Sequence, residues 1–251
     1  MLSADASYSR CVLRDIFVAL QVPGTTYSRL TLSELTWSRG GIIFVAATGE
    51  TIRNFNLAVT DTIMTDMVDQ TLTFHNGHGY ENVAVEVSRL SVTTSAGISV
   101  LSFYGDYQRL GNVTMSLSST SIDASNAAAF ILPWFVAPFT ARDVRLLALD
   151  CNLTATGGAV LGITRGRTYA SSATVVTASG ILINATNSNL TAVGTSYVVS
   201  AGYLIPMSGN GALQMSLNNS EFVAINSVIT ATASSSFAAA LSAVMSGESS
   251  S

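Results

Sequence analysis

Lysine is absent from this chain, and charge of either sign is scarce. All 11 basic residues among the 251 are arginine, and charged residues make up 10% of the sequence, against a typical ~25%. Without lysine there is no P-loop and no Schiff-base nucleophile. A net charge of −4 with scattered arginines gives no electrostatic footprint for nucleic acid, so we expect no nucleic-acid partner.

Groups that bind metals or form disulfides are also few. Cys11 and Cys151 are the only cysteines, which excludes a disulfide framework. His75 and His78 are the only histidines, and two ligands without a third make a poor metal site. The longest apolar run, Ala127 to Phe139, contains two prolines and is shorter than the ~20 residues of a spanning helix. We therefore expect no metal, no cofactor and no direct membrane span in this segment.

What the chain does contain is apolar residues, small hydroxyl residues and a repeat. Hydrophobic residues make up 48%, the mean hydropathy is +0.44, and serine and threonine together number 61. The pattern of Asn112 to Ala124 is present in seven copies, at intervals of about thirty residues. The second residue of each copy serves as its reference: Ser28, Phe55, Val83, Val113, Val144, Ile181 and Leu213.

Each copy alternates between apolar and polar residues and then shifts phase. The reference position and the positions two, four and nine residues after it are apolar in every copy except at Ser28. The phase skip often carries Asp or Asn, which tolerate the left-handed conformation of a bend. Position seven is mostly small, as a tight corner requires, and several copies have a second apolar run, such as Ile42 to Phe44. This pattern predicts strand, bend and strand in every repeat.

The repeat predicts an all-β fold, a right-handed parallel β-helix (solenoid) of about seven coils of roughly 30 residues. An antiparallel sandwich is the alternative, but it does not explain matched inward residues at a fixed repeat. We expect one solenoid domain over residues 1–245 and a polar disordered tail over residues 246–251. No capping element is evident, so the segment is expected to belong to a longer array, with further coils or domains of the same protein as its partners.

Two copies resemble a known family. The lines NVTMSLSSTSIDA (Asn112 to Ala124) and DVRLLALDCNLTA (Asp143 to Ala155) are similar to the dispersed gene family surface proteins of trypanosomes and their kinetoplastid relatives. The resemblance extends from Asn54 to about Ala224. It implies a very large, glycosylated, membrane-associated surface protein with adhesive function. It implies no catalytic residues, and that family's Cys-rich modules and spanning helices have no counterpart in this sequence.

One loop could carry chemistry. Gly77-His78-Gly79 matches a tripeptide of the polygalacturonases, which are β-helix enzymes that hydrolyse pectin with clustered carboxylates. Asp61 and Asp66 lie upstream but form no adjacent pair, and the uronate-binding lysine of those enzymes is missing. The simpler interpretation is a glycine-rich loop between strands. A carbohydrate-active enzyme using His78, Asp61 and Asp66 remains the alternative.

Five N-glycosylation sequons are present. Their asparagines are Asn112, Asn152, Asn184, Asn189 and Asn218. Asn152, Asn184 and Asn189 fall on outward phases of the repeat, and Asn112 and Asn218 fall at turns.

The sequence therefore predicts a non-enzymatic structural or adhesive segment of a secreted or cell-surface glycoprotein. Its expected ligands are glycans or proteins of a host or of the extracellular matrix. A bacterial adhesin or a phage-type fibre of the same architecture is a further alternative.

Overall fold

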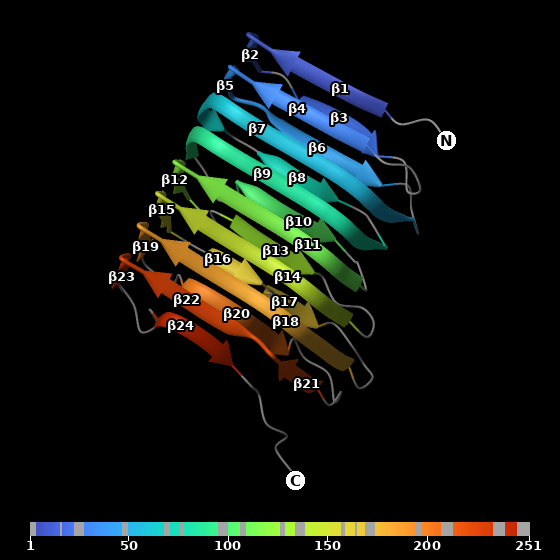
Figure 1. Ribbon diagram of the computed structural model, residues 1–251, viewed down its shortest axis with the longest axis vertical. Coiled ribbons are helices and arrows are strands. Elements are labelled where there is room, and N and C mark those ends of the chain that lie inside the picture. The colour runs from blue at the N-terminus through green and yellow to red at the C-terminus, as the bar shows by residue number, and fades with distance from the viewer. Residues whose placement is uncertain are drawn as a thin grey trace.

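The computed structural model is built from parallel strands, with no helix among the residues that it describes (Figure 1). It describes residues 4–15, 17–22, 28–46, 50–67, 71–75, 78–94, 100–105, 109–125, 129–133, 139–156, 159–163, 165–168, 174–193, 197–206, 213–232 and 239–244. The expected disordered tail, residues 246–251, lies outside these ranges. In the described part, no helix is long and apolar enough to cross a membrane.

Fifteen strands form the larger sheet. They are β1 (Ala4–Ser9), β2 (Val12–Arg14), β4 (Ser28–Ser33), β5 (Thr36–Ser38), β7 (Thr51–Met67), β9 (Gly79–Thr94), β11 (Arg109–Ser118), β12 (Ser121–Ala124), β14 (Phe139–Leu149), β15 (Asn152–Ala155), β18 (Thr174–Thr186), β19 (Asn189–Val193), β21 (Leu213–Asn218), β22 (Glu221–Ile225) and β23 (Val228–Thr232).

Nine strands form the second sheet. They are β3 (Phe17–Val22), β6 (Gly41–Ala46), β8 (Leu72–His75), β10 (Leu101–Gly105), β13 (Ala129–Pro133), β16 (Ala159–Ile163), β17 (Arg165–Thr168), β20 (Tyr197–Pro206) and β24 (Ala239–Val244). The second apolar runs of the sequence supply these strands; Ile42 to Phe44, for example, lies in β6.

Every strand pairing in the described residues is parallel and joins equivalent positions of successive repeats, which rules out the antiparallel sandwich. One column of register partners defines eight repeats, numbered 1 to 8 from here on. Its members are Ala6, Leu30, Leu57, Val85, Met115, Leu146, Ile183 and Phe222. The intervals between them grow steadily along the chain, from 24 residues to 39. The arrangement fits a β-solenoid whose loops lengthen toward the C-terminus.

The predicted register of the last copy is wrong. Leu213 pairs with Thr174 and Met215 with Val176, so β21 continues the first half of β18 rather than its second half. The true partner of Ile183 is Phe222. The prediction failed because β21 alternates in the same way as the strand that follows it. An Asn follows each of these two strands, so the sequence pattern fits at either place.

The core is made of columns of like residues, as the repeat predicts. Val113 and Met115 are at most 1% exposed, and each lies between register partners on both sides. Val113 lies between Val83 and Val144. Because repeats 3 to 7 all place apolar groups at these positions, the core is continuous through the middle of the stack.

Sharp corners in the larger sheet are each formed by one residue in the left-handed conformation. The first corner is formed by Asn54, Asn82, Asn112, Asp143, Gly180 and Asn219, with φ between 49° and 66°. The second corner is formed by Arg10, Glu34, Asp61, Arg89, Ser119, Asp150, Asn187 and Asn226, with φ between 47° and 54°. The expected bend residues Asp61, Asp150 and Asn187 are confirmed at the second corner. Asn219 lies at the first corner instead, for the reason given above.

Candidate functional site

Polar side chains gather at the corners, and at the first corner they bond along the stack. Asn112 Nδ2 donates to Asn82 Oδ1 at 3.0 Å, and Asn82 Nδ2 donates to Asn54 Oδ1 at the same distance. Asp143 follows in the next repeat. In the repeat after Asp143, the corner residue is Gly180. A Cβ at this position would lie 2.7 Å from Asp143 Oδ1, which explains why a glycine is found there. These polar groups therefore join one repeat to the next.

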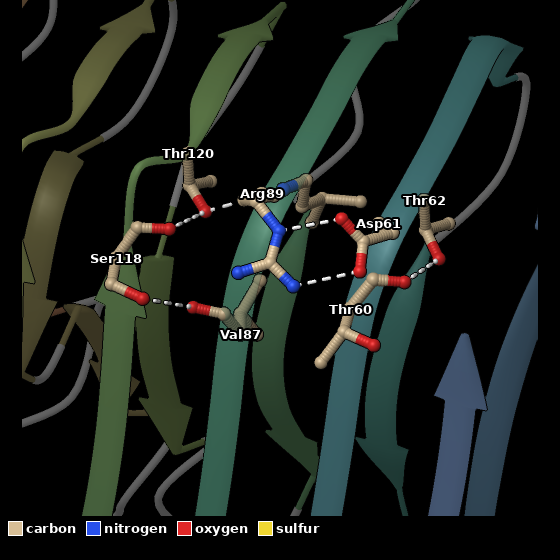
Figure 2. A network of polar contacts seen from close by, with 8 residues as sticks. Thr60, Asp61, Thr62, Val87, Arg89, Ser118 and Thr120 are labelled. Carbon is tan, nitrogen blue, oxygen red and sulfur yellow. Dashed lines mark hydrogen bonds and ion pairs between the residues drawn. The ribbon is translucent and has the colours of Figure 1, made fainter. Parts of the chain in front are cut away.

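A column of mostly buried residues directly follows the second corner. Its members are Cys11, Leu35, Thr62, Leu90, Thr120, Cys151, Ser188 and Ser227. The hydroxyl of Ser188 donates to the Thr186 carbonyl at 2.8 Å and accepts the Cys151 N–H at 3.1 Å. The hydroxyl groups of Thr62 and Thr120 also each donate to the carbonyl two residues earlier in the chain, as Figure 2 shows. Small hydroxyl groups thus satisfy backbone groups that the corner leaves inside.

Ion pairs join the second corner of neighbouring repeats in the N-terminal half. Arg89 lies beside Asp61, and its Nε and Nη2 donate to the two carboxylate oxygens at 2.5 and 2.7 Å (Figure 2). The hydrogen bond from Arg89 lowers the pKa of Asp61, and the same bond raises the pKa of Arg89. Arg10 pairs with Glu34 at 2.9 Å in the first two repeats.

A three-residue ion-pair cluster lies near the first corner. Glu81 accepts from Arg53 Nε at 2.7 Å and also from Arg109 Nη2. The hydrogen bond with Arg53, followed by the charges of Arg109 and Arg53, lowers the pKa of the Glu81 carboxyl, although partial burial opposes this shift. Each pair joins residues of different repeats, so these charges bind the repeats to one another.

The Glu81 cluster predicts how stability depends on pH. Because the folded chain favours ionised Glu81, the cluster stabilises fully above the ordinary glutamate pKa of ~4.3, and this stabilisation is lost as the pH falls through the lowered value. We expect Glu81→Gln to reduce the free energy of unfolding at pH 7, and the difference from wild type to shrink toward pH 3. Denaturant titrations at several pH values measure this, with the exposed Glu86→Gln as control. A difference that is constant with pH would contradict it.

The C-terminal half of the second corner has no such pairs among the described residues and forms a shallow groove instead. Its lining includes Ser119, Asp150 and Asn187 from the corner, and Ser121, Asn152 and Asn189 from the next outward position. Asn187 Nδ2 donates to Asp150 Oδ1 at 3.1 Å. Short, mostly uncharged side chains line this groove, whereas ion-paired long side chains occupy the same corner in earlier repeats.

The candidate catalytic residues are not brought together. His78 is exposed just before β9, and its backbone N–H donates to the Glu50 carbonyl at 2.7 Å. Asp61 is on β7 and lies beside Arg89 of β9. Asp66 is exposed at a further bend with φ of 51°. In the described part of the chain, no three His, Cys, Asp or Glu side chains are grouped so that they could hold a metal.

The glycine after His78 has a packing role. A Cβ at Gly79 would lie 3.0 Å from the carbonyl oxygen of Arg109 in the next repeat. That distance is tighter than side chains normally tolerate. Close stacking of the two repeats therefore accounts for Gly79 without any catalytic role.

The five sequon asparagines differ in exposure. Asn112, Asn152, Asn189 and Asn218 are exposed, whereas Asn184 is half-buried and accepts a hydrogen bond from Thr186 Oγ1 at 3.1 Å. Asn152 and Asn189 are direct register partners in the groove. Cys151, between the groove and the core, is buried, and this burial raises the pKa of its thiol.

Comparison with known protein families, characterised proteins and solved structures finds no match to this chain. The geometry of the site therefore carries the functional argument alone.

The ion pairs across repeats were not predicted from the sequence, although the sequence contains a signal for them. Asp61 and Arg89 are 28 residues apart, the interval between their repeats, and such spacing of opposite charges places them side by side.

Proposed function

We propose that the chain is a non-enzymatic structural and adhesive segment of a secreted or cell-surface protein, built as a right-handed parallel β-helix. Contacts between the two sheets support closure of the helix: Phe74 of the smaller sheet packs against Phe55 and Tyr80 of the larger one. Parallel crossovers are right-handed in nearly all proteins. Seven strand spacings of ~4.8 Å give an axial length of roughly 34 Å.

The observation that carries this proposal is the use of polar groups at the corners. The amide pairs and the ion pairs join one repeat to another, as Asn82 joins Asn54 and Arg89 joins Asp61. Hydroxyl groups such as that of Ser188, which accepts the Cys151 N–H, do so as well. A catalytic centre needs polar groups that converge on a substrate instead. A stack held in this way is a rigid rod, which suits a stalk or an adhesive surface with further coils or domains of the same protein at its ends.

Exposed sequons are consistent with an extracellular, glycosylated surface. We expect glycans at Asn112, Asn152, Asn189 or Asn218 when the chain is secreted from a eukaryotic cell, and binding of the folded chain to glycans or proteins of a host or matrix. Beads coated with the purified chain test adhesion to immobilised matrix, with beads coated with a charge-matched globular protein as control. Equal attachment of both would contradict the adhesive role.

A carbohydrate-active enzyme is the second candidate, and the match of Gly77-His78-Gly79 favours it. We expect no release of reducing ends from polygalacturonate or related polymers by the folded chain, because no carboxylate pair lies beside His78 among the described residues. A reducing-end assay over several hours measures this, with His78→Ala as the matched variant. Turnover by the wild type that the His78→Ala variant lacks would establish the enzyme.

A further inference from the structure

Exposed apolar side chains concentrate on the two end repeats. Among the described residues, six large hydrophobic side chains are exposed, and four of them lie in repeats 1 and 8. Val12 is 82% exposed in the first repeat and Val228 is 62% exposed in the last. They occupy the same outward column, because the register from β2 to β23 passes through equivalent positions. Stacking repeat 8 on repeat 1 would therefore place the two valines side by side.

The inward side chains of the two end repeats are complementary in size. In the first repeat, Ala6 and Tyr8 occupy the two inward positions of β1 that pair with Leu30 and Leu32. At the same two positions the last repeat has Phe222 and Ala224. The six repeats between them have no aromatic residue in either column. A large side chain at one end thus meets a small one at the other, in both columns.

We propose that the chain binds a second copy of itself head to tail, and that the parallel register continues across the junction. In this arrangement β22 and β23 of one copy pair with β1 and β2 of the next. Phe222 packs over Ala6, and Tyr8 packs over Ala224. β1 and β2 pair on one side with β4 and β5, and no strand among the described residues pairs with their other edges, which have the hydrogen-bonding groups to accept a parallel strand. The inference does not depend on the proposed surface function, but in it a second copy of the chain takes the place of further coils at these two ends.

The buried column provides a test of the register. Cys11 lies at its start and Ser227 at its end, and both side chains are half-buried. Within the chain they are seven repeats apart, which excludes an intramolecular bridge. In the proposed stack they are register neighbours at ~4.8 Å, inside the Cα separation of 4.4–6.8 Å that a disulfide needs.

The experiment uses the Ser227→Cys variant with Cys151→Ser to remove the other thiol. After mild oxidation at high protein concentration, we expect a ladder of covalent oligomers in which peptide mapping finds residue 11 linked to residue 227. Tyr8→Arg, which places a charge on the end face, should reduce cross-linking at least fivefold. Ile63→Arg, at an exposed apolar position in the middle of the stack, should not.

Every other linkage would overturn the proposal. Bridges between two copies of residue 227, or between two copies of Cys11, would show that like ends meet. Absence of any bridge would show that the ends do not stack. Sedimentation of the unmodified chain over a concentration series gives a second measurement. Association that Tyr8→Arg weakens supports the head-to-tail contact, and a chain that stays monomeric at high concentration contradicts it.

Discussion

Val113→Asp should destabilise the chain by about 4 kcal/mol or more. Val113 is completely buried, and its register partners on both sides, Val83 and Val144, are valines that offer a carboxylate no hydrogen bond. An aspartate there must either stay ionised without a partner or take up a proton. We expect a large fall in the denaturant midpoint, measured by circular dichroism.

The neighbouring position supplies the control for this prediction. Thr114 is on the same strand but faces outward, half-buried between Ala84 and Arg145. Thr114→Asp should change the free energy of unfolding by no more than about 0.5 kcal/mol, as is usual for surface substitutions. If both variants unfolded at the wild-type midpoint, the inward and outward assignment of this strand would be wrong.

The sequence predicts those parts of the fold in which a single physical effect determines the local structure. Burial of every second side chain identifies strands such as Asn112 to Leu117, and identical spacing in successive repeats identifies their partners. The left-handed conformation favours Asp and Asn, so the residue types at Asp61 and Asp150 are enough to mark them as bends. Each of these signals is repeated along the chain, and the repetition makes it readable.

The parts that failed depend on loop length and on side-chain pairing. Two places in the last repeat satisfy the same alternation, and only the 39-residue interval from Ile183 to its partner Phe222 decides between them; the sequence does not encode that length in a pattern. Arg10 and Arg89 occupy a corner where Asp and Asn are usual. Their presence there is explained by the carboxylates of Glu34 and Asp61 in the adjacent repeats. Single residues with such distant partners do not repeat, and so they escape a search for repeats.

Phe74→Ala should cost about 3–5 kcal/mol, because Phe74 connects the two sheets. Its ring is 2% exposed and is stacked on Phe103 at 4.6 Å between centroids. It also meets Phe55 and Tyr80 edge to face, at 5.7 and 6.1 Å. Removal of the ring leaves a cavity that strands of both sheets would have to fill. Urea titration measures the loss.

The size of this loss distinguishes a shared core from two sheets that stand largely alone. Ile63→Ala is the control: Ile63 is on β7 of the larger sheet but is half-exposed, so its truncation should cost less than about 1 kcal/mol. In a double-mutant cycle, Phe74→Ala and Phe103→Ala should couple by about 0.5–1.5 kcal/mol, the value of an aromatic pair. A loss at Phe74 no larger than that at Ile63 would mean that the sheets do not enclose a common interior, and the closed β-helix would have to be abandoned.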